Sequence, residues 1–380
     1  MAEQVEKKKV ELPELFYDLV FAYAISQATD LLHHFQGSTA SVISAFIIFS
    51  VVMVVFINTW MIKSVFINRY GKNSMTDIIL FMIDMAILLY MSNAFEGDIH
   101  NWFQPFAIAT GLLSTVLVVQ YGTVYLTAAK KDDKKIAKLM MLIVATRTVL
   151  VLIGSFLPLN IGIAVFLLGI AVSWILPALG GSVLKLHPLN FPHILERLTL
   201  LTIITFGESI LGIASYFTVK TFNFYSILIF MIVGALFMTY ITQMDHYIDE
   251  NRSGETGIRL IYIHYFVLFG LSLVTISLGF ISEIEIPKNF SVLCLYLGIS
   301  LFYLGLFLTS PYNKKYLRLG KVVIGFFTTT TMVGVILSLI FNNFPEIVSI
   351  TVLVTIANSA MYVHYMVKRT KQNQNYDIKN

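Results

Sequence analysis

The sequence has little cysteine, proline or charge. Cys294 is the only cysteine among 380 residues, so no disulfide can form within the chain, and prolines number 9. Charged residues make up 13% of the sequence and hydrophobic residues 57%, whereas a soluble domain is about one quarter charged. This composition excludes an ordinary soluble domain and indicates a polytopic membrane protein. The net charge of +4 is small, and we expect no nucleic-acid partner.

Several catalytic signatures are also absent. The sequence holds no phosphate-binding glycine-rich loop, no Gly-x-Ser-x-Gly turn and no His-Glu-x-x-His pair. We therefore expect no metal or other cofactor, and an enzymatic function is less favoured than a non-enzymatic one. The charged start, MAEQVEKKKVELPELF, lacks a signal-peptide cleavage site. We expect the first apolar run to remain as an anchor.

Long apolar runs dominate the chain. About 20 apolar residues are needed for a helix to cross a bilayer, and turn residues separate the runs of this length. The sequence therefore predicts an all-α, polytopic integral membrane bundle of about twelve transmembrane helices. The predicted spans are 13–35, 40–66, 76–95, 105–129, 138–157, 161–184, 194–217, 222–246, 257–282, 289–310, 320–341 and 346–367.

The basic residues predict the orientation. If the N-terminus is cytoplasmic, nearly all lysines and arginines fall on that side, including Lys63, Arg69 and Lys72, and only Lys220 and Lys288 fall outside. Such asymmetry follows the positive-inside rule. We predict a multi-pass protein of the cell membrane with both termini cytoplasmic.

The spacing of acidic residues in two spans indicates an internal repeat. Twelve positions separate Asp18 from Asp30, and the same interval separates Glu196 from Glu208. Parallel repeats are a known transporter architecture. We predict two six-helix halves, 13–185 and 186–367, between a cytoplasmic segment (1–12) and a cytoplasmic tail (368–380).

Ionisable residues inside spans are costly and mark functional candidates. Glu14 and Asp18 are four residues apart, so they stack on one helix face, and they need a cation such as Arg197 or Arg259. The alternative is that these charges only hold helices together. The candidates for binding a proton, an ion or a substrate are Glu14, Asp18, Asp84, Arg147, Glu196, Arg197, Glu208, Ser209 and His264.

Three of these candidates lie near the middle of their spans. Asp84 and Glu208 could share Arg147, which leaves one acid free to bind a proton. Gly207 and Ser209 form a small patch that a neighbouring backbone could approach. His264 is either a proton relay or a hydrogen-bonded packing residue.

Two stretches carry a family resemblance. VELPELFYDLVFAYAISQATDLL, which begins at Val10, and HILERLTLLTIITFGESILGIA, which begins at His193, resemble the bacterial low temperature requirement protein A family. The first matches the family pattern Glu-Leu-Phe-Phe-Asp-Leu-Val-Phe with Tyr17 in place of a phenylalanine. Glu196, Arg197, the Gly-Glu-Ser run and His264 also match. The family's Trp pair before an acid is missing, so no role is carried over to Asp245.

The resemblance implies the helical plan and the important polar residues, and it names no substrate. We expect a transporter or channel that moves a small solute or ion, with protons as the coupling ion and the lipid bilayer as partner. The alternatives are an intramembrane lipid-modifying enzyme and a non-catalytic membrane component that supports growth in the cold.

Overall fold

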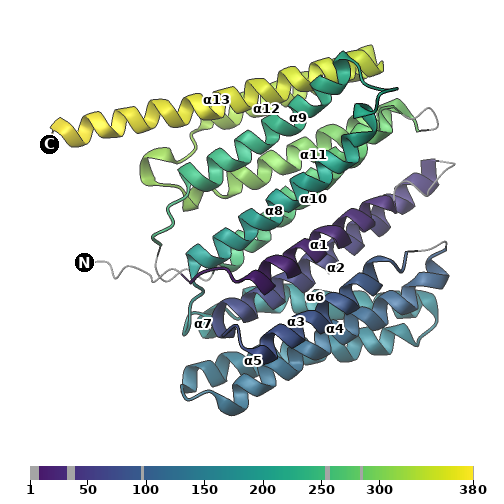
Figure 1. Cartoon of the computed structure of the whole chain (residues 1–380), viewed down its shortest axis with the longest axis vertical. Coiled ribbons are helices and arrows are strands. Elements are labelled where there is room, and N and C mark those ends of the chain that lie inside the picture. The colour runs from purple at the N-terminus through teal and green to yellow at the C-terminus, as the bar shows by residue number, and fades with distance from the viewer. Residues whose placement is uncertain (1–7, 32–38, 96–97, 253–256, 283–285, 380) are drawn as a thin grey trace. The chain divides into compact units, whose positions relative to one another are not determined.

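The computed structural model describes residues 8–31, 39–95, 98–252, 257–282 and 286–379 (Figure 1). These residues are almost entirely helical, and their one β-type contact is a single bridge between Ile248 and Asn313. The predicted all-α class is confirmed. The α-helices are α1 (Leu12–Asp30), α2 (Thr39–Tyr70), α3 (Met75–Ser92), α4 (Ile99–Thr127), α5 (Lys131–Ser155), α6 (Leu159–Leu179), α7 (Gly181–Leu184), α8 (Phe191–Ile213), α9 (Phe224–Ile241), α10 (Ile258–Phe280), α11 (Lys288–Leu308), α12 (Lys321–Phe341) and α13 (Phe344–Lys379).

Eleven helical segments of the described chain are long and apolar enough to cross a membrane, which confirms a multi-pass membrane protein. They correspond to eleven of the twelve predicted spans. The remaining predicted span, 13–35, contains α1, a helix of 19 residues that is not among the eleven. Glu14 and Asp18 lower the hydropathy of this helix, and residues 32–35 lie outside the described part.

The chain divides into two compact units. The first comprises Met1–Leu201 and Asn251–Ile261, and the second comprises Thr202–Glu250 and Tyr262–Asn380. The chain passes from one unit to the other within α8 and again within α10. The predicted repeat of two six-helix halves stays a prediction.

In the first unit, α2 is the central helix. It contacts α1, α4 and α6, while α3, α4, α5 and α6 pack successively against one another (Figure 1). The α2 span is 67% buried, more than any other span that lies wholly in this unit. Polar side chains on α2 therefore face protein, where each needs a partner.

The second unit contains close helix contacts made by glycine. Here α13 packs against α9 and α12, and α11 packs against α12. A Cβ atom on Gly298 of α11 would lie 2.7 Å from the carbonyl oxygen of Gly270 on α10, which is closer than any real contact. Small residues let helix backbones approach in this way inside membranes.

The start of α8 positions the site described below. Asn190 precedes the helix, and its Oδ1 accepts a hydrogen bond of 3.1 Å from the backbone nitrogen of His193. Asparagine is a favoured N-cap residue, and Pro192 in the first turn has no backbone N–H to satisfy. The sequence LNFPHILERL thus fixes where α8 begins.

Candidate functional site

The carboxylates of α1 meet basic groups of α8 in the first unit. Glu14 Oε2 lies 3.1 Å from His193 Nε2, and Arg197 donates to Asp18 through both Nε and an NH2 group. His193 and Arg197 are four residues apart, as are Glu14 and Asp18, so both pairs stack at one-turn intervals. Two helices with the same spacing can therefore form both contacts at once.

Both carboxylate oxygens of Asp18 accept hydrogen bonds. Besides Arg197, it accepts a hydrogen bond of 2.7 Å from the indole nitrogen of Trp60 on α2. The Arg197 guanidinium carbon also lies 5.3 Å from the centre of the Trp60 ring, a cation–π distance. Asp18, Trp60 and Arg197 are all 0% exposed. These groups form a closed cluster that joins α1, α2 and α8.

Glu14 is held more loosely than Asp18. It is 3% exposed, and its Oε2 lies 3.5 Å from Arg197 Nε in addition to the His193 contact. The approach of His193 is bent, so neither Nε2 nor Glu14 Oε2 makes a straight hydrogen bond. A buried carboxylate oxygen therefore keeps capacity for another hydrogen bond.

A second ion pair lies in the same unit. Lys63 Nζ of α2 is 2.5 Å from Asp84 Oδ2 of α3, and it donates to Gln120 Oε1 of α4 at 2.7 Å. The ammonium also lies 5.1 Å from the centre of the Phe81 ring. The cation in contact with Asp84 is thus Lys63, and the expected sharing of Arg147 by Asp84 and Glu208 stays a prediction.

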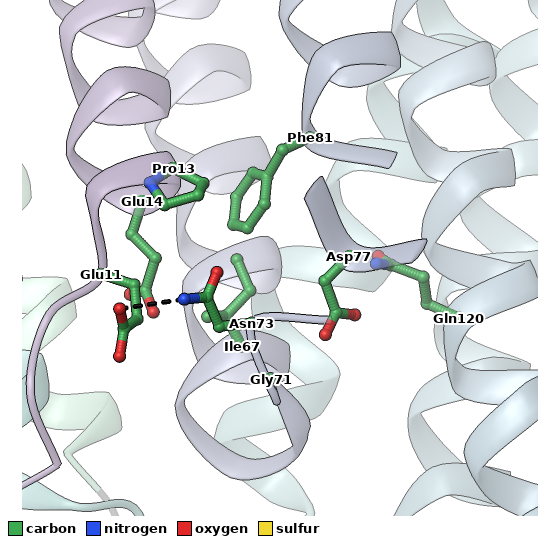
Figure 2. Close-up of a pocket in the computed structure, with 9 residues that line it drawn as sticks. All are labelled: Glu11, Pro13, Glu14, Ile67, Gly71, Asn73, Asp77, Phe81 and Gln120. Atoms are coloured by element: carbon green, nitrogen blue, oxygen red, sulfur yellow. Dashed lines mark hydrogen bonds between the residues drawn. The ribbon is translucent and has the colours of Figure 1, made fainter. Parts of the chain in front are cut away.

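A small pocket adjoins Glu14 and Gln120 (Figure 2). Its cavity volume is about 10 Å³, which is enough for about one water molecule. The pocket lies where α1 begins, α2 ends and α3 begins. Its lining residues are Glu11, Pro13, Glu14, Ile67, Gly71, Asn73, Asp77, Phe81 and Gln120.

Lys8 also lies near this pocket. Its ammonium donates to the carbonyl oxygens of Ile67 and Gly71 at 2.6 and 3.1 Å. Burial lowers the pKa of Lys8, and the Glu14 carboxylate opposes that shift. The Lys8 ammonium therefore adds positive charge on the side of the pocket from which α1 starts.

A short stretch of α2, residues 58–63, supplies several polar contacts. Arg147 of α5 donates to Thr59 Oγ1 at 2.6 Å, and Ser173 of α6 donates to Asn58 Oδ1 at 2.8 Å. Together with Trp60 and Lys63, these residues of the run NTWMIK make hydrogen bonds or ion pairs with five other helices, α1, α3, α4, α5 and α6. The polar residues of α2 therefore hold the first unit together.

The other predicted residues lie in different surroundings. Glu196 is half-buried in the first unit. Glu208 is half-buried in the second unit, where buried Ser209 contacts Thr275 Oγ1 at 2.6 Å. His264 is buried and lies 3.3 Å from the hydroxyl of Tyr240. Whether Glu208 and His264 meet Asp18 and Asp84 stays a prediction.

The structure bears on two further details of the sequence interpretation. Among the described residues, a Cβ atom on Gly207 would meet nothing within 4 Å, whereas a Cβ atom on Gly212 would lie 2.7 Å from Thr275 Cγ2. Arg259 is exposed, and the guanidinium beside Glu14 and Asp18 is that of Arg197.

Sequence reasoning missed several site residues. The sequence interpretation used Lys63 only as a basic residue of the cytoplasmic side, whereas the structure buries it in α2 with 1% exposure. The i, i+4 spacing of His193 and Arg197 matches that of the α1 acids and was the available signal. Trp60 and Gln120 resemble ordinary span residues, and nothing in the sequence singled them out.

Comparison with known families agrees with these motifs. The model of the bacterial low temperature requirement A protein family matches residues 9–364. The chain belongs to this family. The match begins just before α1 and ends within α13, so it covers nearly all helices of this low temperature requirement A protein. A search of curated proteins found no match.

The described ranges contain no cluster of metal-binding side chains. Within those ranges, no group of three His, Cys, Asp or Glu side chains is placed to hold a metal ion. The one departure from the first family motif, Tyr17, is buried and lies within electrostatic range of Asp84, Arg197 and Asp18. The residue that differs from the pattern is thus within electrostatic range of members of both ion pairs.

Proposed function

We propose that this protein is a proton-coupled membrane transporter for a small solute or ion, in which Glu14 binds and releases the coupling proton. One observation supports this role above the others. Glu14 has a buried carboxylate oxygen that makes no straight hydrogen bond, and the residue lines a pocket of about one water molecule. A proton carrier needs such a group with access to water.

The surroundings of the two α1 acids favour Glu14 over Asp18. Both oxygens of Asp18 accept hydrogen bonds from Arg197, and one of them also accepts from Trp60. Hydrogen bonds to a charged carboxylate stabilise that charged form. We therefore assign the positioning of Arg197 to Asp18 and proton exchange to Glu14, whose Oε2 makes no straight hydrogen bond.

The charge balance supports the same assignment. Among the groups in direct contact, Glu14 and Asp18 carry two negative charges when ionised and Arg197 carries one positive charge, which leaves a net charge of −1 when His193 is neutral. The Lys8 ammonium lies outside this contact shell, within electrostatic range of Glu14. Unbalanced charge is costly inside a membrane protein. Binding one proton at Glu14 neutralises this cluster.

One residue that lines the pocket also contacts the second ion pair. Gln120 lines the pocket and accepts a hydrogen bond from Lys63, which in turn contacts Asp84. A water molecule in the pocket could contact both Glu14 and Gln120. We propose that the Lys63–Asp84 pair responds to the protonation of Glu14 and takes part in binding the transported solute or ion.

Proton flux into liposomes tests this proposal. Purified protein is reconstituted with an internal pH-sensitive dye, an inward proton gradient is imposed, and sodium, potassium and chloride are supplied in turn as counter-ions. We expect acidification faster than in protein-free liposomes with at least one of these ions. The Glu14→Gln variant should reduce the rate to the protein-free level, because an amide cannot carry the proton.

Two matched variants complete this experiment. Glu11→Gln removes another carboxylate that lines the same pocket, and we expect this variant to retain most of the flux. Glu208→Gln changes the half-buried acid of the second unit. Wild-type flux in Glu14→Gln would overturn the proposal, and loss of flux only in Glu208→Gln would move the proton site to the second unit.

A further inference from the structure

Asn68 is placed to decide which nitrogen of His193 carries a proton. Its side-chain nitrogen Nδ2 lies 3.0 Å from His193 Nδ1. The same side chain contacts Asn190, the N-cap residue of α8, through both ends of its amide. Asn68 therefore links the end of α2 to the start of α8 immediately beside the Glu14 contact.

The backbone of Asn190 fixes the orientation of the Asn68 amide. The Asn190 N–H can only donate, so the oxygen of Asn68 faces it, at 2.8 Å. The Asn190 carbonyl can only accept, so the Asn68 NH2 group faces it, at 3.0 Å. Rotating the amide by half a turn would break both hydrogen bonds.

This orientation has a consequence for the histidine ring. The second hydrogen of the Asn68 NH2 group points at His193 Nδ1, which must therefore be an unprotonated acceptor. A neutral imidazole then carries its proton on Nε2, which lies 3.1 Å from Glu14. His193 is 0% exposed, so the partners of both ring nitrogens are protein groups.

We infer that Asn68 holds His193 as the neutral tautomer with the proton on Nε2, and that His193 in this form positions the Glu14 carboxylate without carrying the transported proton. This inference rests on the proposed role of Glu14 and refines it. His193 and Asn68 are positioning residues.

The charged groups around Glu14 do not by themselves fix the charge of His193. Arg197 of α8 and Lys8 of the N-terminal segment are the cations, while Asp18, Glu11 and Asp77 are the anions nearest to it or lining its pocket. On its Nδ1 side, His193 faces the uncharged side chain of Asn68. A cationic His193 would carry a proton on Nδ1, where Asn68 presents a hydrogen rather than an acceptor.

Nitrogen-15 NMR of histidine-labelled protein in detergent micelles tests the inference without any transport assay. The chain has 8 histidines, and the signals of His193 are assigned by their loss in His193→Gln. We expect an unprotonated Nδ1 and a protonated Nε2 from about pH 6 to pH 8, where an unconstrained histidine titrates. A proton on Nδ1, or on both nitrogens near neutral pH, would overturn it.

The isosteric variant Asn68→Asp provides a second readout. A carboxylate oxygen can accept a hydrogen bond from Nδ1, so we expect His193 to become doubly protonated in this variant. Asn93→Asp, at the exposed end of α3, is the matched control and should leave the His193 signals unchanged. Unchanged signals in Asn68→Asp would contradict the inference.

Flux measurements separate this inference from the proposed function. In Asn68→Asp, the positive charge on His193 should favour the ionised Glu14, so the pH at half-maximal flux should fall by about one unit or more. If wild-type protein moves no protons but shows the expected tautomer, the transport proposal fails alone. If Glu14→Gln abolishes flux but His193 is doubly protonated, the inference fails alone.

Discussion

At the scale of single residues, Arg197 and Lys63 have the same kind of surroundings. Arg197 lies against Asp18 and the Trp60 ring, and Lys63 lies against Asp84 and the Phe81 ring. A carboxylate offsets the charge, and an aromatic face replaces part of the lost hydration. These surroundings explain how the first unit holds Arg197 and Lys63 buried within helices of a membrane protein.

The Lys63–Asp84 pair gives a stability prediction. Lys63→Met leaves the Asp84 carboxylate buried without its cation, and we expect a loss of about 3–5 kcal/mol in the free energy of unfolding. The double variant Lys63→Met with Asp84→Leu should recover most of this loss, because no charge is then left uncompensated. Denaturant titration in detergent measures all three proteins. A double variant as unstable as the single one would contradict this account.

The sequence predicted only part of the site at this scale. The i, i+4 spacing of Glu14 and Asp18 indicated a shared helix face, and a buried pair of acids needed a cation. The spacing of residues could not show whether Arg197 or Arg259 is that cation, because the answer depends on how α8 packs against α1. Lys63 was not among the predicted site residues because it lies near the end of an apolar run, where loop and helix residues look alike in sequence.

At the scale of elements, the apolar runs of the sequence predicted where helices form. They did not predict which helices contact one another. Eleven predicted spans have matching helices, since length and hydropathy determine them. The central position of α2 was not predicted, because an apolar helix looks the same whether it faces lipid or protein. Its polar run NTWMIK was the signal, since polar side chains within a membrane span usually face protein.

The contact between α10 and α11 gives a prediction at this scale. In Gly298→Leu the new side chain would collide with the backbone of Gly270 and force the helices apart. Overpacking costs about 1–3 kcal/mol, and we expect a lower melting temperature in detergent. Gly325→Leu on α12 is the matched control, because a Cβ atom there meets nothing within 4 Å. Equal melting temperatures for both variants would contradict the packing argument.

At the scale of the whole molecule, the distribution of basic residues predicts that both termini are cytoplasmic. Cys294 is the only cysteine, so Cys294→Ser provides a background for labelling. In intact cells, a membrane-impermeant maleimide should label Lys220→Cys and should not label Lys371→Cys until the membrane is opened. Both native side chains are exposed. Labelling of both sites in intact cells would contradict the predicted orientation.

The central claim is that Glu14 gains and loses a proton while it is buried beside the pocket. Infrared difference spectroscopy during a pH titration of the reconstituted protein measures this directly, through the C=O band of a protonated carboxyl group. We predict that acidification produces this band in the wild type and in the exposed-site control Asp98→Asn, and that it is lost in Glu14→Gln. The same band with undiminished intensity in Glu14→Gln would contradict the account.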